Sequence, residues 1–205
     1  MTNPTPQGSS YLLLKCRAEQ IPLRSGSVSL VITTPPYYGT RGRPQKDCCT
    51  RDPKLYGVFL AQLLGEATRI IKPGGYILVH TGGLQIKRVR GVPRFVFQVL
   101  RKQVRRARQT TRWLKTERFS TQIARVKGFN WGAFPVWVYQ VLIRRYSNPG
   151  ARVVHVCSGS GNSAIAALGL SRLPILLDLH HHRLAQRRLN KLLRRKLLHR
   201  KAQTS

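Results

Sequence analysis

One strand-loop-helix-strand segment restricts the fold of this chain more than any other feature. Residues 152–157 are an apolar run that predicts a buried strand, and residues 158–161, Ser-Gly-Ser-Gly, predict a tight loop after it. Residues 162–170 predict a helix, and residues 173–178 predict a second strand that ends in an aspartate. In such a unit the glycines let the backbone approach a ligand, the helix amino terminus offers free N–H groups, and the acid can accept hydrogen bonds from both ribose hydroxyls. The segment therefore predicts an α/β fold with a nucleotide-type site.

A second segment places two prolines directly after another apolar strand. Residues 27–32 are β-branched and aliphatic and predict a buried strand, which Thr33-Thr34-Pro35-Pro36-Tyr37-Tyr38-Gly39 follows. Neither proline can donate a hydrogen bond to a neighbouring strand, so the strand ends and a rigid turn begins. Open α/β sheets place their ligands at this end of a strand. The turn offers a hydroxyl, carbonyls and aromatic rings, which suit a flat ring with an exocyclic amine. The alternative is an ordinary proline turn with surface tyrosines.

Together the two segments resemble the amino-group DNA methyltransferases that use S-adenosylmethionine. The resemblance is to the subgroup with a circularly permuted order, in which the catalytic motif precedes the cofactor motif. Thr34-Pro35-Pro36-Tyr37 matches the Ser/Thr-Pro-Pro-Tyr form, and Tyr38-Gly39-Thr40-Arg41 continues the pattern. Residues 66–75 resemble the helix and turn that follow in the family, and residues 134–150 resemble the segment before the cofactor strand. The match covers roughly residues 11–83 and 130–190.

This resemblance implies a Rossmann-like methyltransferase fold, S-adenosylmethionine as the cofactor, no metal, and DNA as the partner. The implied catalytic residues are Thr34, Pro35, Pro36 and Tyr37, and the implied cofactor-binding residues are His155, Cys157, Ser158, Gly159, Ser160, Gly161 and Asp178. The threonine before the prolines favours cytosine N4 as the methylated atom, with adenine N6 as the alternative. A degenerate relative that binds nucleic acid without activity is a further alternative, because His155-Val156-Cys157 stands where the family usually has Asp-Pro-Phe. Asn162-Ser163 likewise replaces two threonines, and Ser29 replaces an Asp.

The charge of the chain is extreme. Its 205 residues contain 37 Lys and Arg but only 6 Asp and Glu, for a net charge of +31 at pH 7. Such a balance indicates a polyanionic partner, with nucleic acid as the first candidate and an anionic membrane surface as the second. No apolar run is long enough to span a bilayer, residues 1–10 lack the apolar core of a secretion signal, and the four cysteines show no metal or disulfide spacing. These features predict one cytoplasmic, DNA-associated domain over residues 1–205, and they leave its oligomeric state open.

Residues 84–128 are strongly basic and contain only one acid, Glu117. This stretch lies where the resembled family inserts its target-recognition region, so it is predicted to be a short basic insert with that role. Arginines hold phosphates and reach guanine edges, while aromatic rings stack on unpaired bases. The predicted nucleic-acid-binding residues are Arg41 in the loop after the proline turn, and Arg101, Arg105, Arg106, Arg108, Arg112 and Trp113 in the insert. The alternative is a basic face that only contacts solvent.

The rest of the chain fits a doubly wound sheet. Helical spacing of apolar residues predicts an amphipathic helix over residues 55–71 and a basic amphipathic helix from residue 183 onward. The apolar run at residues 76–79 predicts a strand. The three histidines at 180–182 do not predict a metal site, because consecutive side chains point in different directions. Two other classes remain open. Methyltransferases that modify release factors have the opposite motif order, and a non-enzymatic basic protein leaves both motifs unexplained.

Overall fold

The structure is a computed structural model that describes residues 11–36, 52–80, 94–105, 108–120, 124–127 and 129–204. A seven-stranded sheet forms its centre, in the order β1-β9-β8-β2-β3-β4-β5. The strands of this sheet are β1 (Leu12–Leu14), β2 (Val28–Thr33), β3 (Ile71–His80), β4 (Arg94–Arg105), β5 (Arg108–Ser120), β8 (Arg152–Val156) and β9 (Leu173–Leu177). The first five strands in the spatial order run parallel, and β4 and β5 form an antiparallel hairpin beside β3. The mixed sheet confirms the predicted α/β class.

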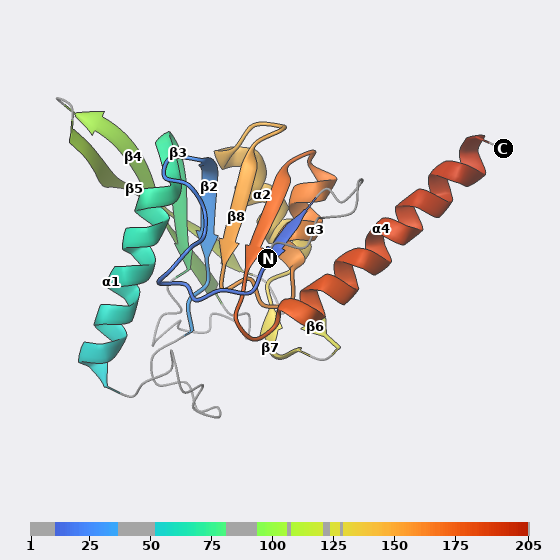
Figure 1. The fold of residues 1–205 in the computed structure, drawn as a ribbon, viewed down its shortest axis with the longest axis horizontal. Helices are drawn as coiled ribbons and strands as arrows, with labels where there is room; N and C mark the ends of the chain where they lie inside the picture. Colours follow the sequence, from blue (N-terminus) through green and yellow to red (C-terminus); the bar gives the residue numbers. More distant parts are fainter. Residues whose placement is uncertain are drawn as a thin grey trace.

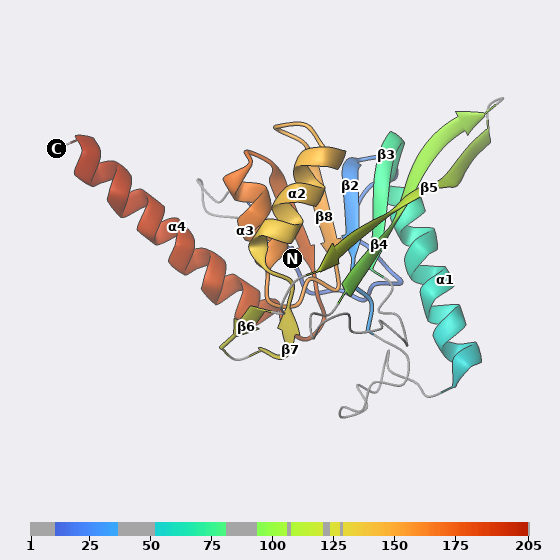
Figure 2. The ribbon, with the colours of Figure 1, turned by 180° about the vertical axis from the view of Figure 1, so that it is seen from behind.

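Helices cover both faces of the sheet (Figures 1 and 2). Helix α1 (Pro53–Ile70) packs Phe59, Leu63 and Ala67 onto one face. Helices α2 (Val136–Tyr146) and α3 (Asn162–Gly169) pack onto the other. Side chains of successive strand residues point to opposite faces, so nearly continuous apolar strands such as β2 supply both layers of the core. This arrangement fits the predicted doubly wound sheet.

Local sequence explains where α1 begins and ends. Asp52 is the N-cap, and its carboxylate accepts a hydrogen bond of 2.8 Å from the Lys54 amide, while Pro53 occupies the first helical position. The chain leaves the helix directly into β3 at Ile71. A side chain at Gly75 would place its Cβ 2.8 Å from the Ser29 carbonyl oxygen, so only glycine lets β3 approach β2 here.

The structure revises the predicted insert. The described residues between 84 and 120 form β4 and β5, which belong to the main sheet, with Phe97, Val99 and Leu100 buried in its core. The buried amine of Lys102 donates two hydrogen bonds of 2.9 Å to the carbonyls of Thr68 and Ile71, which ties β4 to the end of α1. This hairpin is therefore an integral part of the fold. Its role in target recognition remains a prediction.

Two further elements lie outside the sheet. Strands β6 (Ala124–Val126) and β7 (Phe129–Ala133) form a separate pair. Helix α4 (His182–Thr204) packs Ala185 and Leu189 near its start against Ala164 and Leu176, and then extends away from the body of the molecule (Figure 1). The predicted final helix is confirmed. No helix in the described part of the chain is long and apolar enough to cross a membrane.

Candidate active site

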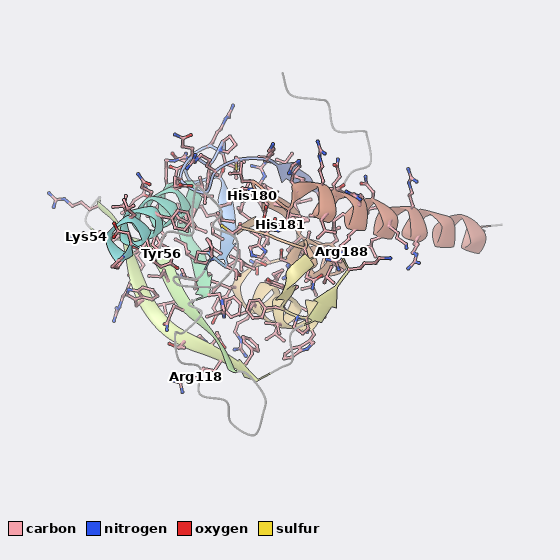
Figure 3. The ribbon with its side chains drawn as sticks, turned by 90° about the horizontal axis from the view of Figure 1, so that it is seen from below. Lys54, Tyr56, Arg118, His180, His181 and Arg188 are labelled. Carbon is pink, nitrogen blue, oxygen red and sulfur yellow. The ribbon has the colours of Figure 1, made fainter. Side chains whose placement is uncertain are left out.

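The structure brings the two motifs together at the carboxyl ends of neighbouring parallel strands. Strand β2 pairs with β8 so that Thr33 lies opposite Val156, and the Thr34 amide donates to the Val156 carbonyl at 3.5 Å. The turn that starts at Thr34 and the loop of residues 158–161 therefore leave the sheet side by side. Figure 3 looks onto this edge, with Tyr56 of α1 on one side and Arg188 of α4 on the other. Tyr37 and Arg41 lie outside the described residues.

The proline turn is fixed by a tyrosine that the sequence did not single out. The Tyr56 hydroxyl, near the start of α1, donates a hydrogen bond of 2.8 Å to the carbonyl oxygen of Pro36. The turn is thus joined to a helix that is itself packed on the sheet. The Pro36 carbonyl therefore already accepts a hydrogen bond, which fixes the orientation of the turn.

Four buried polar atoms at this edge have no hydrogen-bond partner among the described residues. They are Thr33 Oγ1, Thr34 Oγ1, Ser158 Oγ and His155 Nε2. A buried polar atom left without a partner costs roughly 1–3 kcal/mol, so native proteins leave few of them. Their occurrence on two adjacent strand ends makes this edge the candidate site for a polar ligand.

The loop after β8 has an unusual backbone. Cys157, Gly159 and Gly161 have positive φ angles of 60°, 54° and 79°. For a cysteine this conformation is strained, and such strain is found mainly at functional sites. Gly161 also has a steric role, because a Cβ there would lie 3.2 Å from the Ala185 Cβ of α4. Gly161 therefore allows the close approach of α4 to the loop.

Asp178, at the end of β9, closes the loop from the other side. Its Oδ2 accepts a hydrogen bond of 2.7 Å from the Gly159 amide, and its Oδ1 accepts from the amides of His180 and His181 at 2.9 and 2.6 Å. Burial opposes ionisation, but hydrogen bonds from His181 and from these amides outweigh it and lower the pKa of Asp178. A carboxylate offers about four acceptor positions; three amides use three of them, and Nδ1 of the His181 side chain lies 3.5 Å from Oδ1 as a fourth partner.

His155 is a buried, neutral imidazole beneath the loop. Burial lowers its pKa to about 4, against the weaker opposing effect of Asp178. Its Nδ1 lies 2.6 Å from the Ser163 hydroxyl, and its ring lies 5.4 Å from the ring of Tyr139. The remaining nitrogen, Nε2, has no hydrogen-bond partner among the described residues, so His155 contributes a neutral, partnerless polar atom beneath the loop.

Arg188 is a second residue that sequence reasoning missed. From α4 its guanidinium donates to the Ser160 carbonyl and, at 2.8 Å, to the Asn162 side-chain oxygen. Asn162 in turn donates to the Phe134 carbonyl at 2.8 Å. The basic pattern of α4 predicted only an amphipathic helix, because nothing in the sequence shows which of its arginines turns toward the loop.

The predicted nucleic-acid-binding arginines do not gather at this edge. Thr33 lies level with Val79 of β3, which lies level with Gln98 of β4. Arg105 lies seven residues further along β4, about 23 Å toward the opposite end of the sheet at about 3.3 Å per residue. Arg108 pairs with Arg105, Arg112 pairs with Arg101, and the Trp113 side chain is 57% exposed nearby. Only the backbone of Arg105 is described, and Arg106 lies outside the described residues.

Two of the three consecutive histidines hold the loop edge through their backbone amides. His180 and His181 hold Asp178 through their amides. Among the described residues, no group of three or more His, Cys, Asp or Glu side chains lies close enough to hold a metal ion.

Comparison with known proteins shows the fold. No protein-family model matches the chain, and neither does any curated protein sequence. A Thermus thermophilus protein described as a DNA modification methylase, solved with S-adenosyl-L-methionine, aligns with a TM-score of 0.58 at 17% identity over 89% of this chain and 95% of that one. The M1.HpyAVI complex with SAM aligns with a TM-score of 0.57 at 14% identity, over 88% and 99%. The PvuII DNA methyltransferase, cytosine-N4-specific, aligns with a TM-score of 0.54 at 14% identity, over 91% and 94%.

These alignments span almost the whole chain on both sides. At such low identity the similarity shows a shared fold, and the fold is that of S-adenosylmethionine-dependent methyltransferases. The predicted fold class is confirmed. The roles of the individual site residues remain predictions.

Proposed function

We propose that this protein is an S-adenosylmethionine-dependent DNA methyltransferase that acts on an exocyclic amine. The observation that carries the proposal is the convergence of the Thr34 turn and the glycine loop at one edge, with four buried polar atoms that lack partners there among the described residues. The three structural neighbours named above support it, because each is described as a DNA methylase or was solved with the cofactor.

The Thr34 turn acts on the amine. The lone pair of an exocyclic amine is delocalised into its ring, so the amine is a poor nucleophile. Thr34 Oγ1 and the Pro35 carbonyl accept its two N–H bonds and draw the nitrogen out of conjugation. Tyr56 holds the neighbouring Pro36 carbonyl at 2.8 Å and so fixes the direction of the turn. Tyr37 stacks on the extruded base and offsets part of the few kcal/mol lost when the base leaves the duplex.

The glycine loop and its surroundings fit the cofactor. When bound, S-adenosylmethionine supplies the methyl group carried by its sulfonium. The Ser158 hydroxyl and His155 Nε2, which lack hydrogen-bond partners among the described residues, contact its polar groups in this proposal. Asp178 is ionised, and three amides together with the His181 side chain already use most of its acceptor positions, so it accepts at most one ribose hydroxyl rather than two. Catalysis by these residues is mainly positioning, and it needs no covalent intermediate.

The charge distribution supports DNA as the partner. Each of the acids Glu19, Asp52, Glu66, Glu117 and Asp178 is engaged by a cation or an amide of this chain. The described surface therefore has few anionic groups left to balance 37 Lys and Arg. Phosphates supply that charge, and their neutralisation releases counterions.

Cytosine N4 is the proposed methyl acceptor, because a threonine precedes the prolines, and adenine N6 is the alternative. One observation favours a second function, binding of nucleic acid without catalysis. Neutral His155 leaves Asp178 as the only described acid beside a cofactor that carries a sulfonium and an ammonium.

The deciding experiment is incubation of the protein with labelled S-adenosylmethionine and unmethylated DNA, followed by mass spectrometry of the nucleosides. Labelled N4-methylcytosine supports the first choice, and labelled N6-methyladenine supports the alternative. DNA binding without any labelled nucleoside supports the degenerate binder and contradicts the enzyme.

A further inference from the structure

The β4–β5 hairpin continues beyond the point at which β4 stops pairing with β3. Its outer part, residues 101–105 and 108–112, is here called the hairpin arm; it forms the tapering projection at the upper left of Figure 1. Strand β4 pairs with β3 only as far as Arg101, opposite Tyr76. Beyond that point the two strands pair only with each other, so the arm is a two-stranded ribbon, which the buried Lys102 amine anchors at its base to the end of α1.

The register of the arm places arginines opposite arginines. Arg101 pairs with Arg112, and Arg105 pairs with Arg108. Like charges directly opposite on antiparallel strands destabilise a hairpin. The side chains of Arg101, Arg108 and Arg112 are exposed, and Arg101 lies 5.5 Å above the ring of Tyr76.

No acid among the described residues offsets this charge. The nearest in sequence is Glu117, which is already engaged by Arg145, Lys115 and the Tyr146 hydroxyl. Because the opposed arginines of the arm are not neutralised by a nearby acid among the described residues, the arm is suited to bind a polyanion from outside the chain. An anion bound between the opposed arginines lowers their repulsion, so the partner supplies part of the stability of the arm.

The arm points away from the candidate active site. Its tip lies about 23 Å from the level of Thr33, on the side opposite the carboxyl ends of the strands. Other exposed basic residues, among them Lys54, Arg118 and Arg183, lie toward the site edge, where Figure 3 labels the first two. A duplex positioned in front of that edge therefore does not reach the tip of the arm.

We infer that the hairpin arm holds a second segment of double-stranded DNA, so that one protein molecule can bridge two duplexes. A two-stranded β-ribbon fits the major groove of a duplex. Trp113 follows Arg112 directly, so its side chain points to the other face of the ribbon. The arginine face therefore lacks that ring for stacking on unpaired bases, which favours duplex over single-stranded DNA. The inference rests on the proposed DNA partner of the site.

Bridging is tested by capture. Beads carry one biotinylated duplex of about 20 bp, long enough for one site. A second, fluorescent duplex of the same length is retained only when protein holds both. The test variant is R101Q/R108Q/R112Q. The matched control, R24Q/R144Q/R152Q, removes the same charge from exposed residues outside the arm. R101K/R108K/R112K keeps the charge of the arm.

Wild type, the control and the lysine variant are expected to capture the second duplex. The glutamine variant is expected to retain about one tenth or less of the fluorescent duplex that wild type retains. The glutamine variant should still bind a single duplex, with a salt slope shallower by at most about 2.7 for three lost phosphate contacts. Its melting temperature should be unchanged or higher, because the opposed charges are gone. Sedimentation of wild type with excess duplex should show two duplexes per protein chain.

One duplex per chain, no capture by wild type, or equal capture by the glutamine variant would each overturn the inference. Equal capture would instead indicate bridging by pairs of protein molecules. Methyl transfer on single duplexes is measured in parallel. Transfer without capture rejects this inference and leaves the proposed function intact, whereas capture without transfer does the reverse.

Discussion

The Tyr56 hydroxyl donates a hydrogen bond of 2.8 Å to the Pro36 carbonyl, and so joins the first turn of α1 to the proline turn. The two residues are 20 positions apart, with residues 37–55 between them. The bond sets the turn against a helix whose buried face is packed on the sheet. Catalysis that depends mainly on positioning should be sensitive to this contact.

Replacement of Tyr56 by Phe removes the hydroxyl and keeps the ring. We expect methyl transfer at saturating substrates to fall by about tenfold or more, while the free energy of unfolding falls by only about 0.5–1.5 kcal/mol, the net value of one hydrogen bond. Turnover and urea unfolding measure the two effects. Tyr76→Phe, away from the turn, is the control and should leave turnover unchanged. Unchanged turnover in Tyr56→Phe would show that the bond does not orient the turn.

Replacement of Thr34 by Val separates catalysis from stability. Thr34 Oγ1 is buried and has no partner among the described residues, so its loss breaks no hydrogen bond within that part of the fold. Methyl transfer should fall about 100-fold or more, the scale of one positioned catalytic group, with thermal stability unchanged or higher. DNA affinity should stay nearly the same, and Thr34→Ser should recover most of the activity. A Thr34→Val enzyme as fast as wild type would exclude the turn as the active site.

Replacement of Asp178 by Asn tests two roles of this carboxylate, stabilisation of the glycine loop and binding of the cofactor. The amide nitrogen of Asn cannot accept the hydrogen bond that the Gly159 amide donates at 2.7 Å. We expect a loss of about 1–3 kcal/mol in unfolding free energy without ligand, and weaker S-adenosylmethionine binding by calorimetry. If stability falls and affinity does not, Asp178 serves only the loop. If wild type shows no binding at millimolar cofactor, the enzyme proposal fails.

Buried histidines should make the protein sensitive to mild acid. Burial lowers the pKa of His155 and of His80 to about 4, from 6.5. Between these values the unfolded chain binds protons that the folded protein does not, so stability falls as pH falls from 6.5 toward 4. Each histidine contributes up to about 3 kcal/mol over this range. Chemical unfolding at several pH values should show a shallower dependence in His155→Gln; an identical dependence would contradict the assignment.

The net charge of +31 should dominate DNA binding. If six or more phosphates are neutralised, log K should fall against log salt concentration with a slope of about −5 or steeper. Fluorescence anisotropy with a duplex across a salt series measures the slope. A slope near −1, about one phosphate contact, would show that most of the charge never reaches the DNA backbone.

The fold was predictable wherever apolar residues follow a regular period. The spacing of Phe59, Leu63 and Ala67 predicted α1, and uninterrupted apolar runs predicted the central parallel strands, which the structure confirms. The hairpin was harder, because its arginines suggested a surface insert. Buried Phe97 and Val99 do alternate with Gln98 and mark β4 as a half-buried strand, but the surrounding charge hid that signal.

The site residues that belong to a sequence motif were predictable. The side chains that donate hydrogen bonds to backbone carbonyls were not. Thr34 and the glycine loop follow strands whose adjacency the α/β order implies. Tyr56 and Arg188 bind the backbone of Pro36 and Ser160, and a backbone carbonyl leaves no sequence pattern for its donor. The engagement of Asp178 by three amides likewise depends on a loop conformation that appears only in three dimensions.

The pairing of β2 with β8 also determines when the protein can fold during its synthesis. Thr33 and its partner Val156 are about 120 residues apart, so the central strand pair of the sheet forms only after both have left the ribosome. At about 5–20 residues per second, β2 waits roughly 6–25 s for β8. Throughout that interval one edge of β2 stays open beside a strongly cationic nascent chain. Early contact of this chain with ribosomal RNA or with a chaperone is the expected consequence of an order in which β2 is made long before β8.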